Sequence, residues 1–449
     1  MFGIFKSLPV QQEIIDSDTI DQNYRYWRVH IMITMFVGYA AFYFTRKSFT
    51  FAMPAMIIDL GMDKTNIGIL ATLFYVIYGC SKFLSGIISD HSNPRYFMGV
   101  GLIATGVTNI LFGFSSSLVA FSILWGLNAF FQGWGWPACS KLLNFWYSRS
   151  ERGFWWAIWN TAHNVGGALI PLLVGICTLY YGWRYGLIIP GIIAIILGLF
   201  VCWRLRDKPS TLGLPTIGQW KNDLLEIKHA NNSRPLPVRE ILKSHILQSK
   251  PLWLLAAASV LVYIVRTAMN DWGNLYLIEV GGYDLVTANA AVTGFEIGGF
   301  LGSIVAGWGS DRFFQGERVP MLIIFSIGVL VSSISLCFSA HAPYSLQAAS
   351  FFFIGFFIFG PQMLLGMTAL ETSHKEAAGA ATGFIGLFSY IGAALAGYPV
   401  AKIIELFQWS GFFTLITVAA TITAIILLPF CRVKRLASYE KTVMTPAED

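Results

Sequence analysis

Apolar stretches long enough to cross a bilayer recur along almost the whole chain. A transmembrane helix needs about 20 predominantly apolar residues. Reading the sequence on that length gives twelve spans, which lie near 29–51, 66–88, 96–115, 118–140, 154–179, 185–203, 251–278, 286–307, 319–339, 346–368, 378–404 and 410–431. The pattern therefore predicts an all-α membrane protein with twelve transmembrane helices.

The longest polar interruption divides these spans into six and six. It is rich in Lys, Arg, Asn and Pro, and its Pro235 and Pro237 argue against one continuous helix. We therefore expect two pseudo-symmetric halves and three connecting or terminal parts. In chain order these are an N-terminal segment (1–28), a six-helix half (29–203), a central loop (204–250), a second six-helix half (251–431) and a tail (432–449).

The composition agrees with a polytopic membrane protein. The 449 residues are 55% hydrophobic and 12% charged, whereas soluble domains carry about 25% charged residues. The polar N-terminus lacks the order of charges, apolar core and small residues that marks a signal peptide. The six cysteines are scattered and none is in CxxC spacing, so we expect no metal site, no disulfide framework and no cofactor.

Basic residues are distributed unequally between the two sides of the predicted bundle. The N-terminus, the even-numbered loops and the C-terminus together hold 23 of the 30 Lys and Arg residues. The odd-numbered loops hold three, namely Lys64, Arg184 and Lys402, and four lie within spans. By the positive-inside rule both termini and the central loop are expected to be cytoplasmic, in a bacterial inner membrane.

Two short motifs recur in the second half of the chain. Residues 86–90 read GIISD and residues 307–311 read GWGSD, an offset of 221. YYGWRYG at 180–186 similarly corresponds to LFQWSGF at 406–412. A parallel six-span repeat is typical of secondary transporters. We expect Asp90 and Asp311 to hold helix ends at the cytoplasmic side through basic neighbours, namely Arg95 and Arg312.

The repeat pairs two arginines that lie inside apolar spans. Arg46 precedes Asp90 by 44 residues, and Arg266 precedes Asp311 by 45. A charge at the bilayer centre costs at least about 2.5–3.5 kcal/mol. A matched pair of arginines in such positions therefore indicates a functional role. Either arginine alone is also compatible with a side chain that snorkels to the interface. The match predicts that both face the central interface between the halves.

Two guanidinium groups at such an interface suit a phosphate ester. Arginine binds phosphate with a planar, bidentate fork, and a phosphate monoester carries about −1.5 to −2 charges near neutral pH. Lys82 and His163 are expected to assist, although each also has a structural reading. Lys47 has no counterpart in the repeat and is expected to snorkel. Glu296 is expected to act as a counter-ion to Arg266, with proton transfer as the alternative.

Aromatic side chains on the predicted central helices are candidates for contact with the sugar, and helix packing is the competing interpretation for all of them. They are Tyr39, Tyr43, Trp134, Trp159, Tyr263 and Tyr390.

Several segments carry a family resemblance. They read RKSFTFAMP, YGCSKFLSGIISDHSNPR, FFQGWGWPACSKLLNFWYSRSERGFWWAIWNTAHNVGGAL and DWGNLYLIEVGGY. The chain resembles the major facilitator superfamily and, within it, the hexose-phosphate branch of the organophosphate:inorganic phosphate antiporters. That branch includes hexose-6-phosphate transporters, their sensor relatives and the glucose-6-phosphate translocase. The resemblance implies phosphate binding by Arg46 and Arg266, with Lys82 and His163 in the corresponding supporting positions. The span at 378–404 departs from some members, because it has no charge before Lys402.

The predicted function is exchange of a sugar phosphate, with glucose 6-phosphate or another hexose 6-phosphate first, for inorganic phosphate by a monomer in the bilayer. The alternatives are a membrane sugar-phosphate receptor that signals to a kinase partner and a glycerol-3-phosphate:phosphate antiporter. A proton-coupled symporter or drug exporter using Glu296 is disfavoured by the paired arginines. An enzyme is disfavoured further, because the sequence has no P-loop, metal-ligand spacing or nucleophile constellation. No nucleic-acid partner is expected.

Overall fold

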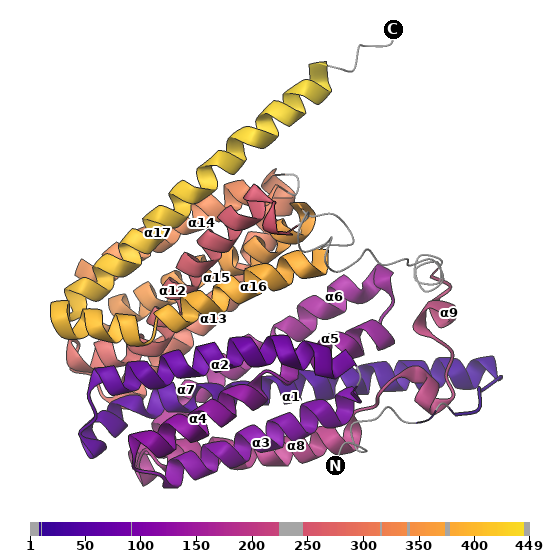
Figure 1. The fold of residues 1–449 in the computed structure, drawn as a ribbon, viewed down its shortest axis with the longest axis horizontal. Coiled ribbons are helices and arrows are strands. Elements are labelled where there is room, and N and C mark those ends of the chain that lie inside the picture. The colour runs from indigo at the N-terminus through magenta and orange to yellow at the C-terminus, as the bar shows by residue number, and fades with distance from the viewer. Residues whose placement is uncertain are drawn as a thin grey trace. The chain divides into compact units, whose positions relative to one another are not determined.

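Helices and the short segments that connect them make up the part of the chain that the computed structural model describes. The described residues are 9, 11–90, 92–223, 246–314, 317–338, 342–372 and 378–443. The chain divides into two compact units (Figure 1). Unit 1 comprises Met1–Arg234 and Asp284–Thr293, and unit 2 comprises Pro235–Tyr283 and Gly294–Asp449.

Unit 1 contains the first six predicted spans. Ser117 begins α4 by accepting a hydrogen bond from the backbone of Ala120, and Asn93 caps α3, which has Pro94 at its first position. The predicted spans 118–140 and 154–179 are each divided into two helices, α4 with α5 and α6 with α7. The elements are α1 (Ser17–Leu60), α2 (Lys64–Asp90), α3 (Pro94–Phe114), α4 (Leu118–Gln132), α5 (Gly135–Trp146), α6 (Arg149–Asn160), α7 (Ala162–Tyr181), α8 (Tyr185–Arg204), the 3-10 helix η2 (Pro209–Leu212) and α9 (Ile217–Lys221).

Unit 2 contains the remaining predicted spans. The first turns of α13 belong to unit 1 and the rest of that helix to unit 2. Gln408 interrupts α17 with φ 55° and ψ −161°, which separates the end of the predicted span 378–404 from the start of the last one. The helices are α12 (Lys250–Glu279), α13 (Leu285–Phe314), α14 (Arg318–Phe338), α15 (Tyr344–Thr372), α16 (Ala378–Leu395) and α17 (Tyr398–Val443).

The predicted all-α membrane architecture is confirmed. Helix covers part or all of every predicted span. Within the described ranges, nine helices are long and apolar enough to cross a membrane by length and composition. Helix α1 covers the first predicted span, 29–51, which contains the charged residues Arg46 and Lys47.

Glycines spaced seven residues apart bring α3 and α8 into close contact, and Figure 1 shows the two helices side by side. A Cβ added at Gly106 would lie 2.6 Å from the backbone oxygen of Gly191, and one added at Gly191 would lie 2.8 Å from that of Gly106. Gly99 and Gly198 repeat this approach one heptad away. Small residues let membrane helices pack backbone to backbone, so the sequence specifies this pairing.

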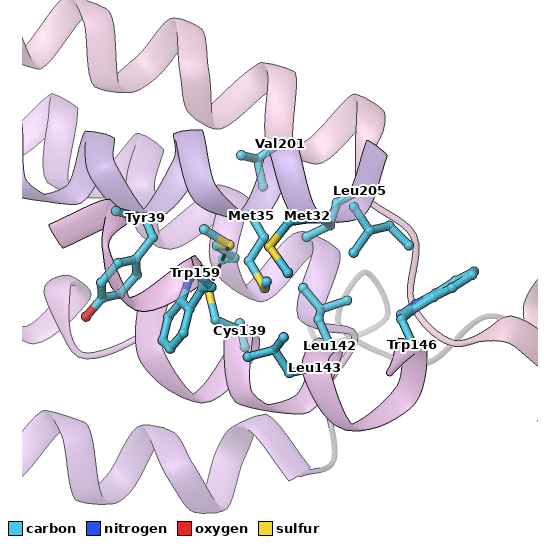
Figure 2. Close-up of a cluster of buried hydrophobic side chains, with 14 of the residues drawn as sticks. Met32, Met35, Tyr39, Cys139, Leu142, Leu143, Trp146, Trp159, Val201 and Leu205 are labelled. Atoms are coloured by element: carbon cyan, nitrogen blue, oxygen red, sulfur yellow. Dashed lines mark hydrogen bonds between the residues drawn. The ribbon is translucent and has the colours of Figure 1, made fainter. Parts of the chain in front are cut away.

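The core of unit 1 lies where α1 meets α5 and the end of α6. Met32 and Met35 of α1 pack with Cys139 and Leu142 of α5, and all four are nearly or fully buried. Figure 2 shows this cluster extending to Tyr39 at one end and to Trp146 and Leu205 at the other. The cluster fixes the rotation of α1, and it therefore fixes the direction in which the next turns of α1 present their side chains.

Candidate functional site

Arg46 is buried in unit 1 and held by two neutral side chains. Only 7% of its surface is exposed. Its Nε donates a hydrogen bond to Gln132 Oε1 at 3.3 Å, and its Nη2 donates to Tyr78 OH at 3.0 Å. These partners come from α4 and α2, so three helices orient the guanidinium group. A buried charge is costly unless it is hydrogen-bonded, and these contacts offset part of that cost.

Gln132 is itself held by a network that selects its orientation. Its Nε2 donates to Phe42 O at 3.1 Å, to Thr45 Oγ1 at 2.9 Å and to Asn128 Oδ1 at 3.2 Å. Because these three atoms are acceptors, the amide nitrogen must face them and Oε1 must face Arg46. Gln132 is therefore a positioning residue for Arg46, and the sequence analysis missed it.

Two tyrosine rings also lie beside Arg46. Its Cζ lies 4.5 Å from the ring centroid of Tyr43 and 4.5 Å from that of Tyr78. A guanidinium group over an aromatic face gains a cation–π attraction, which strengthens in a dry environment. The predicted sugar-side residue Tyr43 thus contacts the predicted phosphate-binding arginine directly. Tyr78 was not predicted, although it lies four residues before Lys82 on α2 and therefore shares its face.

Lys47 does not snorkel, and that prediction is wrong. It is 8% exposed, and its Nζ donates a hydrogen bond to Tyr75 OH at 3.2 Å. The tyrosine lies on α2, three residues before Tyr78. Lys47 is thus held inside unit 1 by a tyrosine hydroxyl group, which could not be predicted from the apolar pattern of α2.

A series of aromatic contacts links the surroundings of Arg46 to Lys82. Tyr39 lies 6.2 Å from Tyr43 and 4.9 Å from Trp159 between ring centroids. Trp159 lies 4.8 Å from Trp136, and the Nζ of Lys82 lies 4.7 Å from the Trp136 ring centroid. Figure 2 shows the Tyr39 and Trp159 rings next to each other. Arg46, Lys82 and three predicted sugar-side aromatics, Tyr39, Tyr43 and Trp159, therefore belong to one continuous group, which we call the Arg46 group.

The break between α4 and α5 brings this group close to α2. A Cβ added at Gly133 would lie 2.9 Å from the backbone nitrogen of Lys82. Only glycine allows so close an approach without a shift of α2. The residues GWGW at 133–136 thus combine a close helix contact with the tryptophan that covers the Lys82 ammonium group.

His163 and Trp134 differ in their relation to Arg46. His163 is half-buried, its Nδ1 contacts Asn160 O, and its ring centroid lies 5.9 Å from that of Tyr43. Trp134 instead stacks on Phe97 of α3 with ring centroids 4.4 Å apart. The structure brings His163 next to the Arg46 group, and it gives Trp134 a packing contact against α3.

In unit 2, Arg266 lies among aromatic side chains of α12 and α15. Its Cζ is 4.6 Å from the ring centroid of Phe359 and 5.8 Å from that of Tyr263. Tyr263 in turn lies 6.2 Å from Tyr390 of α16. Arg266 is half-buried. The second arginine therefore has an aromatic setting like that of Arg46, and it is made from two predicted sugar-side tyrosines and one residue that was not predicted.

Glu296 is 2% exposed and accepts a hydrogen bond from Asn270 Nδ2 at 2.8 Å. Asn270 lies one helical turn after Arg266 on α12. The contact joins α12 to α13 inside unit 2. It gives the buried carboxylate a neutral donor, which the sequence analysis did not anticipate. The role of Glu296 as a counter-ion to Arg266 stays a prediction.

The loop motifs hold helix ends, with partners that differ from those expected. Asp311 forms an ion pair with Arg318, whose Nη1 lies 2.6 Å from Asp311 Oδ1 and whose Nη2 lies 2.9 Å from Glu371 Oε1. Arg312, the expected partner, is exposed. In unit 1, Arg95 donates to the carbonyl oxygens of Cys202 and Trp203. The side chain of Asp90 lies outside the described residues.

Residues 35–397 match the family model of the Major Facilitator Superfamily. The chain is 60% identical to the protein named membrane sensor protein UhpC of Escherichia coli K12, over 92% of this chain and 94% of that one. It is 50% identical to a probable hexose phosphate transport protein of Chlamydia pneumoniae, over 93% of this chain and 94% of that one.

A solved structure supports the same architecture. The chain superposes on an inward-facing bacterial homolog of the human lysosomal transporter Spinster with a TM-score of 0.67. The superposition covers 90% of this chain and 95% of the other, at 12% sequence identity. At that identity the likeness concerns the fold alone.

Proposed function

Because this chain belongs to the Major Facilitator Superfamily, in its organophosphate:inorganic phosphate antiporter branch, we propose that it exchanges a hexose phosphate for inorganic phosphate. Family membership makes it a multi-pass membrane protein with bacterial relatives and not an enzyme. Glucose 6-phosphate is the first candidate substrate, and a bacterial inner membrane is the proposed location. The likeness to a hexose phosphate transport protein over 93% of the chain supports the substrate class.

The observation that carries the proposal is the fixed orientation of the buried Arg46. A guanidinium group that Gln132 and Tyr78 already hold in place loses little entropy when it binds an anion. Arginine suits a phosphate because its planar fork matches two oxygens at once. The Arg46 group of unit 1 thus has the chemistry needed to recognise the phosphate that a hexose phosphate and inorganic phosphate share.

We assign the second guanidinium group to Arg266 of unit 2, on the basis of the sequence repeat and its aromatic surroundings. An anion that engages both arginines would favour the occluded state from which the site opens to either side. Without an anion, two like charges would oppose that state. The empty carrier would then reorient slowly, and exchange would be nearly obligatory.

The remaining roles are proposed from contacts with the aromatic side chains around each arginine, within its own unit. Lys82 and His163 would add positive charge or a hydrogen bond to the phosphate, since both adjoin the aromatic group around Arg46. The sugar would contact the rings of Tyr39, Tyr43 and Trp159 in unit 1. In unit 2 it would contact those of Tyr263 and Tyr390.

The test is uptake of labelled glucose 6-phosphate by vesicles that contain the purified full chain. We expect uptake when the vesicles are loaded with phosphate and none when they are loaded with sulfate. Uptake that does not depend on internal phosphate would contradict exchange. If phosphate-loaded vesicles take up glycerol 3-phosphate and not glucose 6-phosphate, the hexose assignment fails and the antiport mechanism stands.

A second candidate function is supported by one observation. The identity to the membrane sensor protein UhpC, 60%, exceeds the identity to the hexose phosphate transport protein, 50%. A receptor would use the same Arg46 group to bind the ligand but would signal to a partner kinase rather than move solute. Specific binding of glucose 6-phosphate without uptake into phosphate-loaded vesicles would favour the receptor over the exchanger.

A further inference from the structure

Two arginines at one end of unit 1 bind the same backbone oxygen. Arg95 of α3 donates from Nη2 to Trp203 O at 3.2 Å, and Arg206, just after α8, donates from Nη1 to the same atom at 3.0 Å. Arg206 also donates to Leu205 O at 3.0 Å. The two guanidinium groups therefore lie next to each other around the C-terminal end of α8.

A third guanidinium group joins them across the ring of Trp27. The Cζ atoms of Arg204 and Arg206 lie 5.0 Å and 4.5 Å from the Trp27 ring centroid. Arg204 also lies over the ring of Tyr26, 5.1 Å from its centroid, and donates a hydrogen bond to the Tyr26 hydroxyl. Arg95, Arg204 and Arg206 together form what we call the arginine cluster.

The arginine cluster concentrates positive charge. Burial, followed by the charges of Arg95 and Arg204, lowers the pKa of the Arg206 guanidinium group, because a nearby like charge disfavours the charged form. The exposed Arg25 on the neighbouring turn of α1 forms its own ion pair with Asp21, with Nε and Oδ2 2.8 Å apart.

Capping of α8 does not require so many arginines. One guanidinium group can satisfy the last carbonyl oxygens of a helix and interact favourably with its dipole. Arg95 already does so through Cys202 O and Trp203 O. Arg204 donates instead to a tyrosine hydroxyl, so the third charge serves no carbonyl at this helix end in the contacts described for it.

An apolar stripe on α8 leads directly to the arginine cluster. The exposed side chains follow a helical spacing of four, three and four residues along one face, and they are Ile192, Ile196, Leu199 and Trp203. Val29 and Ile33 of α1 are also more than half exposed. Such a face suits acyl chains, with Trp203 and Tyr26 at the level where aromatic residues meet headgroups.

We propose that the arginine cluster binds the headgroup phosphate of an anionic phospholipid, whose acyl chains lie along the exposed stripe of α8. This end of unit 1 is the one that the distribution of basic residues assigns to the cytoplasmic leaflet, where basic groups between helices suit anionic headgroups. The negative phosphodiester relieves the repulsion among the three guanidinium groups, and the apolar stripe distinguishes a lipid from free phosphate.

The test uses the full chain in detergent, with its melting temperature measured as phosphatidylglycerol, phosphatidylcholine or inorganic phosphate is added. We expect phosphatidylglycerol to stabilise the protein more than phosphatidylcholine does. In the double variant Arg204→Gln/Arg206→Gln the half-saturating concentration of phosphatidylglycerol should rise about thirtyfold, since each basic group near an anionic surface contributes about fivefold. The matched control Arg25→Gln should respond like the wild type.

An unchanged response to phosphatidylglycerol in the double variant would overturn the proposal, because the arginines would then only cap α8. If the double variant also lost its response to inorganic phosphate, the cluster would be a site for the free anion, and the lipid assignment would fail. A double variant that keeps its phosphate response is folded, and the Arg46 group is then independent of the cluster. If the double variant does not fold, the single variants should each show a rise of about fivefold.

Discussion

The indole Nε1 of Trp183, just before α8, donates a hydrogen bond to Asp59 Oδ2 at the end of α1, at 2.8 Å. Unit 2 repeats this contact, because Trp409 Nε1 donates to Glu279 Oε2 at 2.9 Å. The tryptophans are 226 residues apart (409 − 183) and the acids 220 (279 − 59). The internal repeat therefore extends from short motifs to a specific indole–carboxylate contact in each unit.

Removal of the indole N–H should weaken unit 1, and because Trp183 is only 4% exposed, the smaller ring of phenylalanine also leaves unfilled space there. Trp183→Phe keeps an aromatic ring but loses the hydrogen bond, which we expect to cost about 1 kcal/mol because Asp59 is exposed. A double-mutant cycle with Asp59→Ala, which removes the acceptor, should give a coupling energy of similar size when the unfolding free energy is measured in detergent. Independent effects of the two substitutions would refute the contact. Trp308→Phe, at an exposed position, is the control and should have little effect.

Exchange of either intramembrane arginine for lysine should nearly abolish transport. Lysine keeps the charge but loses the bidentate fork. Loss of one or two charge-assisted hydrogen bonds corresponds to at least about a tenfold loss of phosphate-ester affinity. Arg46→Lys and Arg266→Lys should therefore fail alike in the uptake measurement. Arg312→Lys, at an exposed position, should transport normally, and normal exchange by either of the first two variants would disprove the two-arginine assignment.

The orientation of Arg46 should depend on Gln132. Gln132→Met has a similar volume but loses the hydrogen bonds to Arg46 and to the backbone of α1. We expect it to weaken phosphate-ester binding about tenfold through a less ordered guanidinium group. Gln132→Glu should be worse although it keeps an acceptor, because its carboxylate would neutralise Arg46 and compete with the ligand.

Comparison of Gln132→Met with Gln132→Glu distinguishes the loss of the hydrogen bonds that position Arg46 from the effect of an added negative charge. Titration of glucose 6-phosphate against the purified variants gives the dissociation constants directly. Gln347→Met is the matched control, since Gln347 is also buried but bonds Ala342 O near the start of α15. If Gln132→Glu bound as tightly as the wild type, Gln132 would have no electrostatic connection to the ligand site.

The contact between α3 and α8 should not tolerate one added methyl group. A Cβ at Gly106 would lie 2.6 Å from a backbone oxygen that cannot move without the whole helix. We therefore expect Gly106→Ala to destabilise unit 1 by about 1–3 kcal/mol. Gly383→Ala should have the opposite sign, because open space surrounds that position and alanine favours helix by about 1 kcal/mol. Melting temperatures that fall for both variants would contradict this explanation.

The sequence indicated the charged members of the candidate site but not the groups that hold them. Arg46 and Lys82 are conspicuous because charges are rare in apolar spans. Gln132 and Asn128 could also have been noted in the sequence, since they are four residues apart and so share one face of α4. They were missed because neutral amides in apolar spans are less conspicuous than charges. Tyr75 and Tyr78 look like ordinary apolar residues of α2 until the structure places their hydroxyl groups against Lys47 and Arg46.

Contacts between distant segments were the other part that sequence could not supply. The expected partner of Asp311 was the adjacent Arg312, whereas the ion pair is made by Arg318, which also reaches Glu371 from 53 residues away. Periodicity places residues on a helix face, but it does not specify which helices meet. Likewise, the repeat identified Trp183 and Trp409, and the structure was needed to identify their acidic partners.

The position of the Arg46 group has a consequence for how such proteins diversify. Gln132, Tyr78 and Tyr43 all belong to the same unit as Arg46, so the contacts that orient this arginine are made within one half of a duplicated chain. Substitutions away from these residues could then slow or stop the movement of solute while leaving the orientation of Arg46 unchanged. The orientation of Arg46 and the movement of solute would then be separable traits. A carrier and a receptor could diverge from one ancestor without changing the contacts that hold Arg46.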